Sequence, residues 1–212
     1  MWVKFIKFFQ KKFRKSRGIF LKQTYPKINT YKILDVGGSQ SFWNEINILS
    51  NYKNLTILNI KEYQNEYENK DKINTVIYDG KTIPFKNQSF DLIICNSVIE
   101  HVSISHRKLF CKELMRVGKN YFLQTPSFYF PFEPHFVMPF LHWLPKNVGF
   151  LFAHLSPWRI LSNPDKYLIK DYFYNTNLLK EAELKEYFKN SRIFKEKLFL
   201  MTKSYYVIGN SK

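Results

Sequence analysis

Short apolar runs alternate with polar stretches of helical length through the first half of the chain. The runs occupy residues 31–36, 55–60, 74–78, 90–96 and 120–124. Each has the length of a strand and is apolar on both faces, which is typical of a parallel sheet covered by helices on its two sides. Helices are predicted between them, at residues 42–50 and 105–117. The pattern therefore predicts an α/β fold.

A different pattern begins after the fifth run. Residues of about 128–170 are rich in Pro, Phe, Trp and His, and the prolines prevent any long helix there. A stretch of this length inside a domain is usually a lid or a binding loop. Regular structure resumes with a helix predicted from Asn177 to about Lys189, and residues 192–200 and 203–209 are predicted to pair as an antiparallel hairpin.

Composition limits the class of protein. The chain has 212 residues, of which 45% are hydrophobic, so it can form one domain with a sizeable core. Its two cysteines, Cys95 and Cys111, are too few for a disulfide scaffold or a zinc ribbon. These features predict a cytoplasmic protein.

Positive charge is concentrated at the N-terminus. The formal net charge is +16, and residues 1–32 contribute ten basic side chains and no acidic one. The net charge of the remaining residues is only +6. This distribution favours a local anionic partner over a nucleic acid, which usually requires a basic surface spread around the site.

Residues 1–22 are predicted to form a basic amphipathic arm preceding a domain at 23–212. At helical spacing, Trp2, Phe5, Ile6, Phe9 and Phe13 share one side, while Lys4, Lys7, Lys11, Arg14 and Lys15 share the opposite side. No apolar stretch is long enough to span a bilayer. Two interpretations stay open: residues 1–20 lie on an anionic membrane surface, peripheral on the inner face, or the aromatic side packs onto the domain.

The first strand ends in a glycine turn. Its sequence is Ile-Leu-Asp-Val-Gly-Gly-Ser at residues 33–39. Glycine permits a sharp turn and close approach of a ligand, and the helix that follows offers free N–H groups. The spacing differs from the dinucleotide-binding fingerprint.

Polar residues also follow the other strands. Asn59 closes the second strand, Asp79-Gly80 the third and Asn96 the fourth, which is followed by Glu100-His101. Because the carboxyl ends of parallel strands share one edge of a sheet, these residues are expected at a common ligand-binding edge.

Taken together, these motifs resemble the class I S-adenosylmethionine-dependent methyltransferases of the type 11 kind. The matching motifs are the 33–37 strand with its Asp-x-Gly, Asp79-Gly80 followed by Ile-Pro-Phe at 83–85, and Ser-Phe-Asp at 89–91 leading to Glu-His-Val at 100–102. The resemblance extends over residues 31–126 and 177–210. It implies a Rossmann-like sheet of seven strands, mostly parallel with one antiparallel, and S-adenosylmethionine as cofactor.

The resemblance also implies roles by position. Asp35 and Gly37, with Gly38 and Ser39 in the same turn, would face the methionine part of the cofactor, and Asn96 would lie near it. Asp79 would accept a hydrogen bond from the adenine amino group, with Gly80 beside the ring and Ile83 or Phe85 packed on it. There are two departures from the pattern: Ser39 replaces a glycine, and Asn59 replaces the acid that holds the ribose unless Glu62 takes that place.

The sequence identifies catalytic residues less specifically than cofactor-binding ones. His101 has two open interpretations, a general base for an acceptor hydroxyl or a residue satisfied by the backbone, and His135 is the other candidate base. Glu133, His142 and Trp143 are expected at the acceptor, under an aromatic lid or in a packed appendage. The spacing of His135, His142 and His154 lacks a metal-binding pattern, so no metal is expected.

The sequence thus predicts methyl transfer, with oxygen favoured over nitrogen, to a small, glycan or lipid-linked acceptor near a membrane surface. Two alternatives remain: a non-catalytic interaction module, which Ser39 and Asn59 favour, and an RNA methyltransferase, which the charge distribution disfavours.

Overall fold

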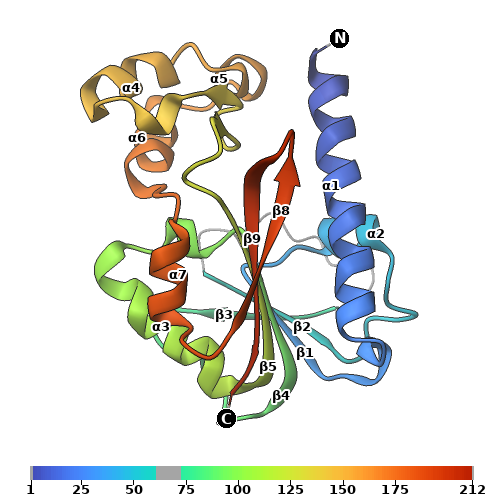
Figure 1. Ribbon diagram of the computed structural model, residues 1–212. Coiled ribbons are helices and arrows are strands. Elements are labelled where there is room, and N and C mark those ends of the chain that lie inside the picture. The colour runs from blue at the N-terminus through green and yellow to red at the C-terminus, as the bar shows by residue number, and fades with distance from the viewer. Residues whose placement is uncertain (1, 61–72, 212) are drawn as a thin grey trace. The chain divides into compact units, whose positions relative to one another are not determined.

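A computed structural model describes residues 2–60 and 73–211, with side chains from residue 11 onward (Figure 1). The chain divides into two compact units. The first comprises Met1–Asn96, Glu113–Tyr121 and Asn210–Lys212, and the second comprises Ser97–Lys112 and Phe122–Gly209.

The predicted sheet is present with seven strands, in the order β3-β2-β1-β4-β5-β9-β8. Their bounds are β1 Ile33–Val36, β2 Leu55–Ile60, β3 Asn74–Tyr78, β4 Phe90–Asn96, β5 Gly118–Pro126, β8 Arg192–Leu198 and β9 Met201–Asn210. Strand β1 pairs in parallel with β2 and β4, and β2 pairs in parallel with β3. The predicted hairpin is the antiparallel pair β8–β9. The mostly parallel α/β sheet is therefore confirmed.

Two helices of the first unit lie side by side. Helix α1 (Trp2–Thr24) runs along α2 (Gln40–Ile46) (Figure 1). A Cβ at Gly18 would lie 2.8 Å from the Cβ of Ile46, so this contact requires a glycine. Helix α2 ends earlier than the predicted residue 50, because Asn47 adopts a left-handed φ of 46°. Among the described helices, none has the length and apolar content needed to cross a membrane.

The remaining helices of the α/β fold are α3 (Ile104–Val117) and α7 (Glu181–Tyr187), with 3₁₀ turns at η1 (Ile28–Thr30) and η3 (Ile99–His101). Helix α7 starts three residues later than predicted, since Asn177 was the expected N-cap. The N-cap is Lys180, whose N–H donates to the Glu183 carboxylate at 2.9 Å. Asn177, the predicted cap, donates its N–H to the Glu100 carbonyl instead.

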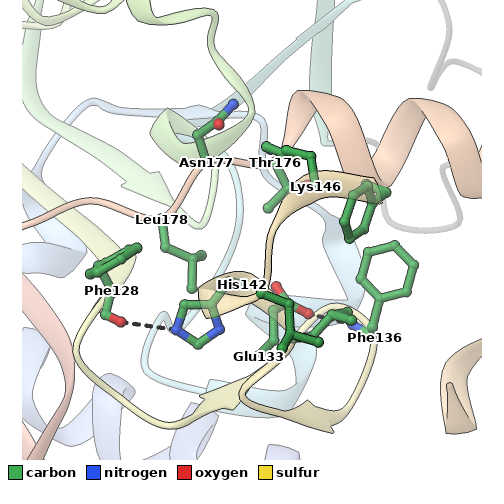
Figure 2. A pocket seen from close by; sticks show the side chains of 11 residues that line it. Phe128, Glu133, Phe136, His142, Lys146, Thr176, Asn177 and Leu178 are labelled. Carbon is green, nitrogen blue, oxygen red and sulfur yellow. Dashed lines mark hydrogen bonds between the residues drawn. The ribbon is translucent and has the colours of Figure 1, made fainter. Parts of the chain in front are cut away.

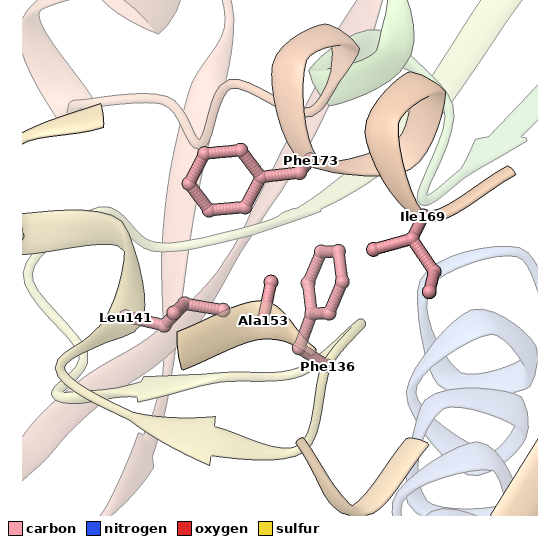
Figure 3. Packing of buried hydrophobic residues seen from close by; sticks show 5 residues of the cluster. All are labelled: Phe136, Leu141, Ala153, Ile169 and Phe173. Atoms are coloured by element: carbon pink, nitrogen blue, oxygen red, sulfur yellow. The ribbon is translucent and has the colours of Figure 1, made fainter. Parts of the chain in front are cut away.

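The aromatic insert has a small core of its own. It contains the strand pair β6 (Phe132–Glu133) and β7 (Met138–Pro139), then η4 (Leu141–Trp143), α4 (Lys146–Ala153), α5 (Pro157–Ser162) and α6 (Lys166–Asn175). None of these helices exceeds 10 residues, as the prolines predict. Its buried side chains converge in Figure 3 and are Phe136, Leu141, Ala153, Ile169 and Phe173.

Candidate functional site

The glycine turn after β1 encloses a buried carboxyl group. Asp35 is fully buried, and a Cβ on Gly38 would lie only 1.8 Å from its Oδ2. Gly37 turns the chain with a φ of 72°. The two glycines of the motif therefore have different tasks: one reverses the chain, and the other leaves room for the carboxyl group.

The Asp35 carboxyl group is only half satisfied. The Trp43 indole N–H donates to its Oδ2 at 2.7 Å, whereas its buried Oδ1 has no hydrogen-bond partner. Burial raises the pKa of Asp35 from 3.8 to about 7, against the opposing effect of the Trp43 hydrogen bond. An unpartnered buried oxygen is costly, so this atom is suited to a ligand that donates hydrogen bonds.

Asn59 and Ser39, the two departures from the sequence pattern, both support the turn. The buried Asn59 donates its amide N–H to the Gly38 carbonyl at 3.0 Å, which leaves its amide oxygen to accept from a ligand. Ser39 is the N-cap of α2, where its hydroxyl accepts from the Phe42 N–H at 3.2 Å. Glu62, the alternative to Asn59, lies outside the described residues.

Asp79 lies at an exposed turn after β3. Its Oδ1 accepts from the backbone N–H groups of Lys81 and Thr82 at 2.9 and 3.3 Å, and these bonds lower its pKa. Gly80 follows with a φ of 77°. Asp79 is therefore a fixed, ionised acceptor.

The apolar residues of the same loop are held in place from α3. Ile83 is buried, and half-buried Phe85 packs edge-on against Phe90 at 4.9 Å between ring centroids. Arg116 donates to the carbonyls of Ile83 and Phe85 at 2.8 and 2.7 Å, and Glu113 accepts from the Ile83 N–H at 2.9 Å. This clamp fixes the loop beside Asp79, with Phe85 as the accessible one of the two apolar side chains.

One cationic residue lies at the carboxyl-terminal edge of the strands and was not predicted from the sequence. Arg17 of α1 is 6% exposed and donates from its guanidinium to the side-chain oxygen of Asn96, the last residue of β4. Its Nε is buried without a partner. The neighbouring Gly18, which permits the close packing of α1, was the available signal. Arg17 thus brings a positive charge to the predicted methionine end.

The second unit contains a polar cluster formed by Glu100, His101 and His135, with Glu133 bonded to it. Glu133 accepts from the backbone N–H of Phe136 through Oε2 and pairs with the His135 Nδ1 through Oε1, both at 2.6 Å. His135 Nε2 lies 3.9 Å from Glu100 Oε1, a buried atom without a hydrogen-bond partner. The His101 ring lies edge-on to that of His135, with 4.8 Å between centroids. The sequence-predicted candidates His101 and His135 are therefore neighbours.

The two histidines differ in basicity. Burial lowers the pKa of His101 to about 3, with a smaller contribution from the nearby His135 and Arg107. Burial also acts to lower the pKa of His135, but Glu133 and Glu100 outweigh it, and the net shift is upward. Of the two, only His135 is basic enough to accept a proton near neutral pH.

A pocket of about 210 Å³ lies beside this cluster, in the same unit (Figure 2). Glu133 and Thr176 line the pocket and also contact the cluster, because Thr176 hydrogen-bonds His101 Nδ1 at 3.2 Å. His142 lines it too, with Nε2 bonded to the Phe128 carbonyl at 2.9 Å and Nδ1 buried without a partner. Trp143, the third residue expected at the acceptor, donates to the same carbonyl at 2.8 Å but does not line the pocket.

Comparisons with known proteins agree with the fold. Residues 34–121 match a family described as "Methyltransferase domain". Three solved structures with the same fold are magnesium protoporphyrin IX methyltransferase from Synechocystis with bound SAH, the PH0226 protein from Pyrococcus horikoshii, and TehB from Haemophilus influenzae. Among curated proteins, none matches the chain.

The likeness to these structures covers nearly all of this chain. The Synechocystis enzyme is 11% identical with a TM-score of 0.56, over 97% of this chain and 84% of its own. The Pyrococcus protein is 13% identical with a TM-score of 0.57, over 96% and 92%. TehB is 14% identical with a TM-score of 0.52, over 93% and 62%.

Proposed function

We propose that this chain, whose residues 34–121 match a methyltransferase domain, is a methyltransferase of the class I S-adenosylmethionine-dependent fold and transfers a methyl group to an oxygen atom of a small, glycan or lipid-linked acceptor. The observation that carries the proposal is the pair of unsatisfied polar atoms in the first unit, Asp35 Oδ1 and Arg17 Nε. The Asp35 oxygen suits a cationic group, and the Arg17 nitrogen suits an anionic group. An amino acid carries both charges, which is what the methionine part of the cofactor offers.

The other residues of this edge suit the rest of the cofactor. Asp79 has a carboxylate oxygen to accept from the adenine amino group, and Phe85 of the clamped loop provides an apolar surface for the ring, with Ile83 buried beneath the loop. The Asn59 amide oxygen can accept from one ribose hydroxyl. Because only one such acceptor is offered where the pattern has an acid, we expect the ribose to be held less tightly.

The cofactor supplies a methyl group already activated by its sulfonium, so the protein has to position the acceptor and remove its proton. The pocket of the second unit, with Glu133 and His142 among its lining residues, is the proposed acceptor site. The cluster of Glu100, His101 and His135 is proposed to activate the acceptor hydroxyl, with His135 as its basic member. Glu100 follows Asn96 by four residues in the sequence.

Transfer of a labelled methyl group from S-adenosylmethionine to fractionated cell extract tests this proposal. The expected result is label in one acid-stable, non-proteinaceous fraction, lost with His135→Ala, while binding of S-adenosylhomocysteine is retained. The exposed His106 provides the matched control, and His106→Ala is expected to keep full transfer. Cofactor binding without transfer to any fraction would instead identify a non-catalytic interaction module.

We also propose that α1 associates with an anionic membrane surface while its C-terminal half stays packed on the domain. Arg14 pairs with Glu45 at 3.0 Å, and Gly18 and Leu21 are buried, so these positions form the packed side of α1. In the sequence, the aromatic series beginning at Trp2 occupies other helical positions. Sedimentation with anionic vesicles, comparing the full chain with a protein lacking residues 1–9, should show binding by the full chain alone.

A further inference from the structure

We propose that Glu100, His101 and His135 form a binding site for a divalent transition-metal cation such as Zn²⁺. One ligand atom from each of these residues lies within 4.8 Å of the others. Two imidazoles and one carboxylate are a ligand set that binds zinc and leaves a coordination position open. The catalytic consequence of this site rests on the proposed function, but the binding of the cation does not.

The carboxylate is placed to be a ligand. Glu100 is fully buried, its Oε2 accepts from the Thr125 hydroxyl at 2.9 Å, and its Oε1 has no hydrogen-bond partner. That oxygen and His135 Nε2 are 3.9 Å apart, too far for a hydrogen bond. A tetrahedral cation about 2.1 Å from each of two ligands places them about 3.4 Å apart, so these two atoms would approach by about 0.5 Å to bind it, and the cation would then satisfy both.

The supporting contacts are those that metal-binding histidines need. Glu133 holds His135 through Nδ1 at 2.6 Å and is itself fixed by the Phe136 N–H, which directs His135 Nε2 toward Glu100. A carboxylate behind a histidine in this way fixes the tautomer and raises the basicity of the ligand. His101 has a partner of its own, the Thr176 hydroxyl.

The backbone that carries two of the ligands is fixed as well. The guanidinium of the buried Arg107 donates to the carbonyls of Glu100, Val102 and Asn177 at 3.4, 3.1 and 2.5 Å. The segment between β4 and α3 is therefore tied to the segment before α7. Support of this kind limits the ligands to the small movements that binding of a cation would require.

The metal site could not be inferred from the insert alone. The spacing of His135, His142 and His154 argued against a metal. In the structure His142 and His154 each use one ring nitrogen to bond a backbone carbonyl, of Phe128 and Phe150 respectively. The fold instead combines His135 with residues that follow β4. The expectation of no metal was thus based on His135, His142 and His154, and not on Glu100, His101 and His135.

A cation here would explain how the acceptor loses its proton. Glu133 and Thr176 connect the cluster to the pocket, so an acceptor hydroxyl in the pocket can reach the open coordination position. With a cation bound, His135 would be a ligand and no longer the base: the cation would lower the pKa of the bound hydroxyl, whose proton passes to bulk water, and the oxygen would form a bond to the methyl carbon as the bond from that carbon to sulfur breaks. The leaving electron pair stays on sulfur.

Titration of the metal-free full chain with Zn²⁺, in competition with a chromophoric chelator, tests the site. We expect one equivalent bound per chain, at least a hundredfold weaker binding in Glu100→Gln and in His135→Ala, and unchanged binding in His106→Ala. Co²⁺ in place of Zn²⁺ should give a visible absorption spectrum of nitrogen and oxygen ligation that both cluster variants lose. A large excess of Mg²⁺ should not compete, because it prefers ligand sets made only of oxygen.

Two results would overturn the metal site: no binding by the wild-type chain, or equal binding by wild type and the cluster variants. Circular dichroism and binding of S-adenosylhomocysteine show whether each variant is folded, and His135→Gln replaces any variant that is not. Zinc binding and cofactor binding are measured separately, so a chain that binds the cofactor but no zinc rejects this inference alone. A chain that binds zinc but no cofactor rejects the proposed methyl transfer alone.

Discussion

The guanidinium of Arg17 donates a hydrogen bond to the side-chain oxygen of Asn96, which links the N-terminal helix to the carboxyl end of β4. Helix α1 therefore contributes to the edge of the first unit that is proposed to bind the cofactor, in addition to its proposed role at a membrane. The buried, unpartnered Nε of Arg17 leads to a first prediction about the carboxylate of the cofactor.

Arg17→Gln should weaken binding of S-adenosylhomocysteine about 10- to 100-fold, because a hydrogen bond to a charged group contributes about 1.5–3 kcal/mol. Binding of 5′-methylthioadenosine, which lacks the amino acid part, should not change. Calorimetry with both ligands separates the two effects. Arg14→Gln is the matched control, since Arg14 pairs with the partly exposed Glu45 and should leave both affinities unaltered. Equal loss for both ligands would show that Arg17 supports the fold only.

Asp35→Asn should make the protein more stable at high pH. The pKa of Asp35 is raised from 3.8 to about 7, so the native protein keeps a proton that the unfolded chain has released. Stability of the wild type is therefore lost as pH rises from about 4 to about 7. The variant avoids this loss, which amounts to at most about 4 kcal/mol above pH 7. Urea unfolding of both proteins at about pH 5 and pH 8 measures it.

Asp91→Asn is a control in which the pH dependence of stability should be opposite to that expected for Asp35→Asn. Lys119 and a backbone N–H hold the pKa of Asp91 below its ordinary value, so its contribution to stability is present at neutral pH and lost on acidification. Wild type should thus exceed this variant at neutral pH, and the difference should shrink in acid. A difference between wild type and Asp35→Asn that does not change with pH would contradict the raised pKa of Asp35.

Gly38→Ala should destabilise the first unit. The new Cβ would lie 1.8 Å from the Asp35 carboxyl, and such overpacking costs about 1–3 kcal/mol. In the double variant Asp35→Ala with Gly38→Ala the clash is gone. Its loss of stability should therefore be smaller than the sum of the losses in the two single variants. Denaturant unfolding of the four proteins completes the cycle. Strict additivity would mean that the two residues do not compete for the same space.

Much of the fold was predictable because it depends on local pattern. Two-sided apolar runs predict buried parallel strands, and all five predicted runs are strands of the sheet. Boundaries set by distant contacts were not predictable. The predicted cap Asn177 is bonded through its backbone to Glu100 and Arg107, which lie far away in the sequence, and helix α7 begins only after it.

The same limit applies to the site. Asp35, Gly38 and Asp79 belong to short motifs whose geometry is local, so the sequence alone could propose them as candidates. Arg17 acts at the end of a strand 79 residues away, and its role depends on how α1 packs. His135 joins Glu100 only through the folding of the insert, so single-sequence spacing could not bring them together.

Calorimetric titration of the full chain with S-adenosylhomocysteine, in parallel with Asp79→Ala, tests the central claim most directly. Asp79 is exposed, so its replacement removes an acceptor for the adenine amino group without disturbing the core. Saturable binding of one ligand per chain, abolished in Asp79→Ala, is the predicted result. No heat and no thermal shift for the wild-type chain at millimolar ligand, or equal binding by the variant, would contradict the assignment of this edge as the cofactor site.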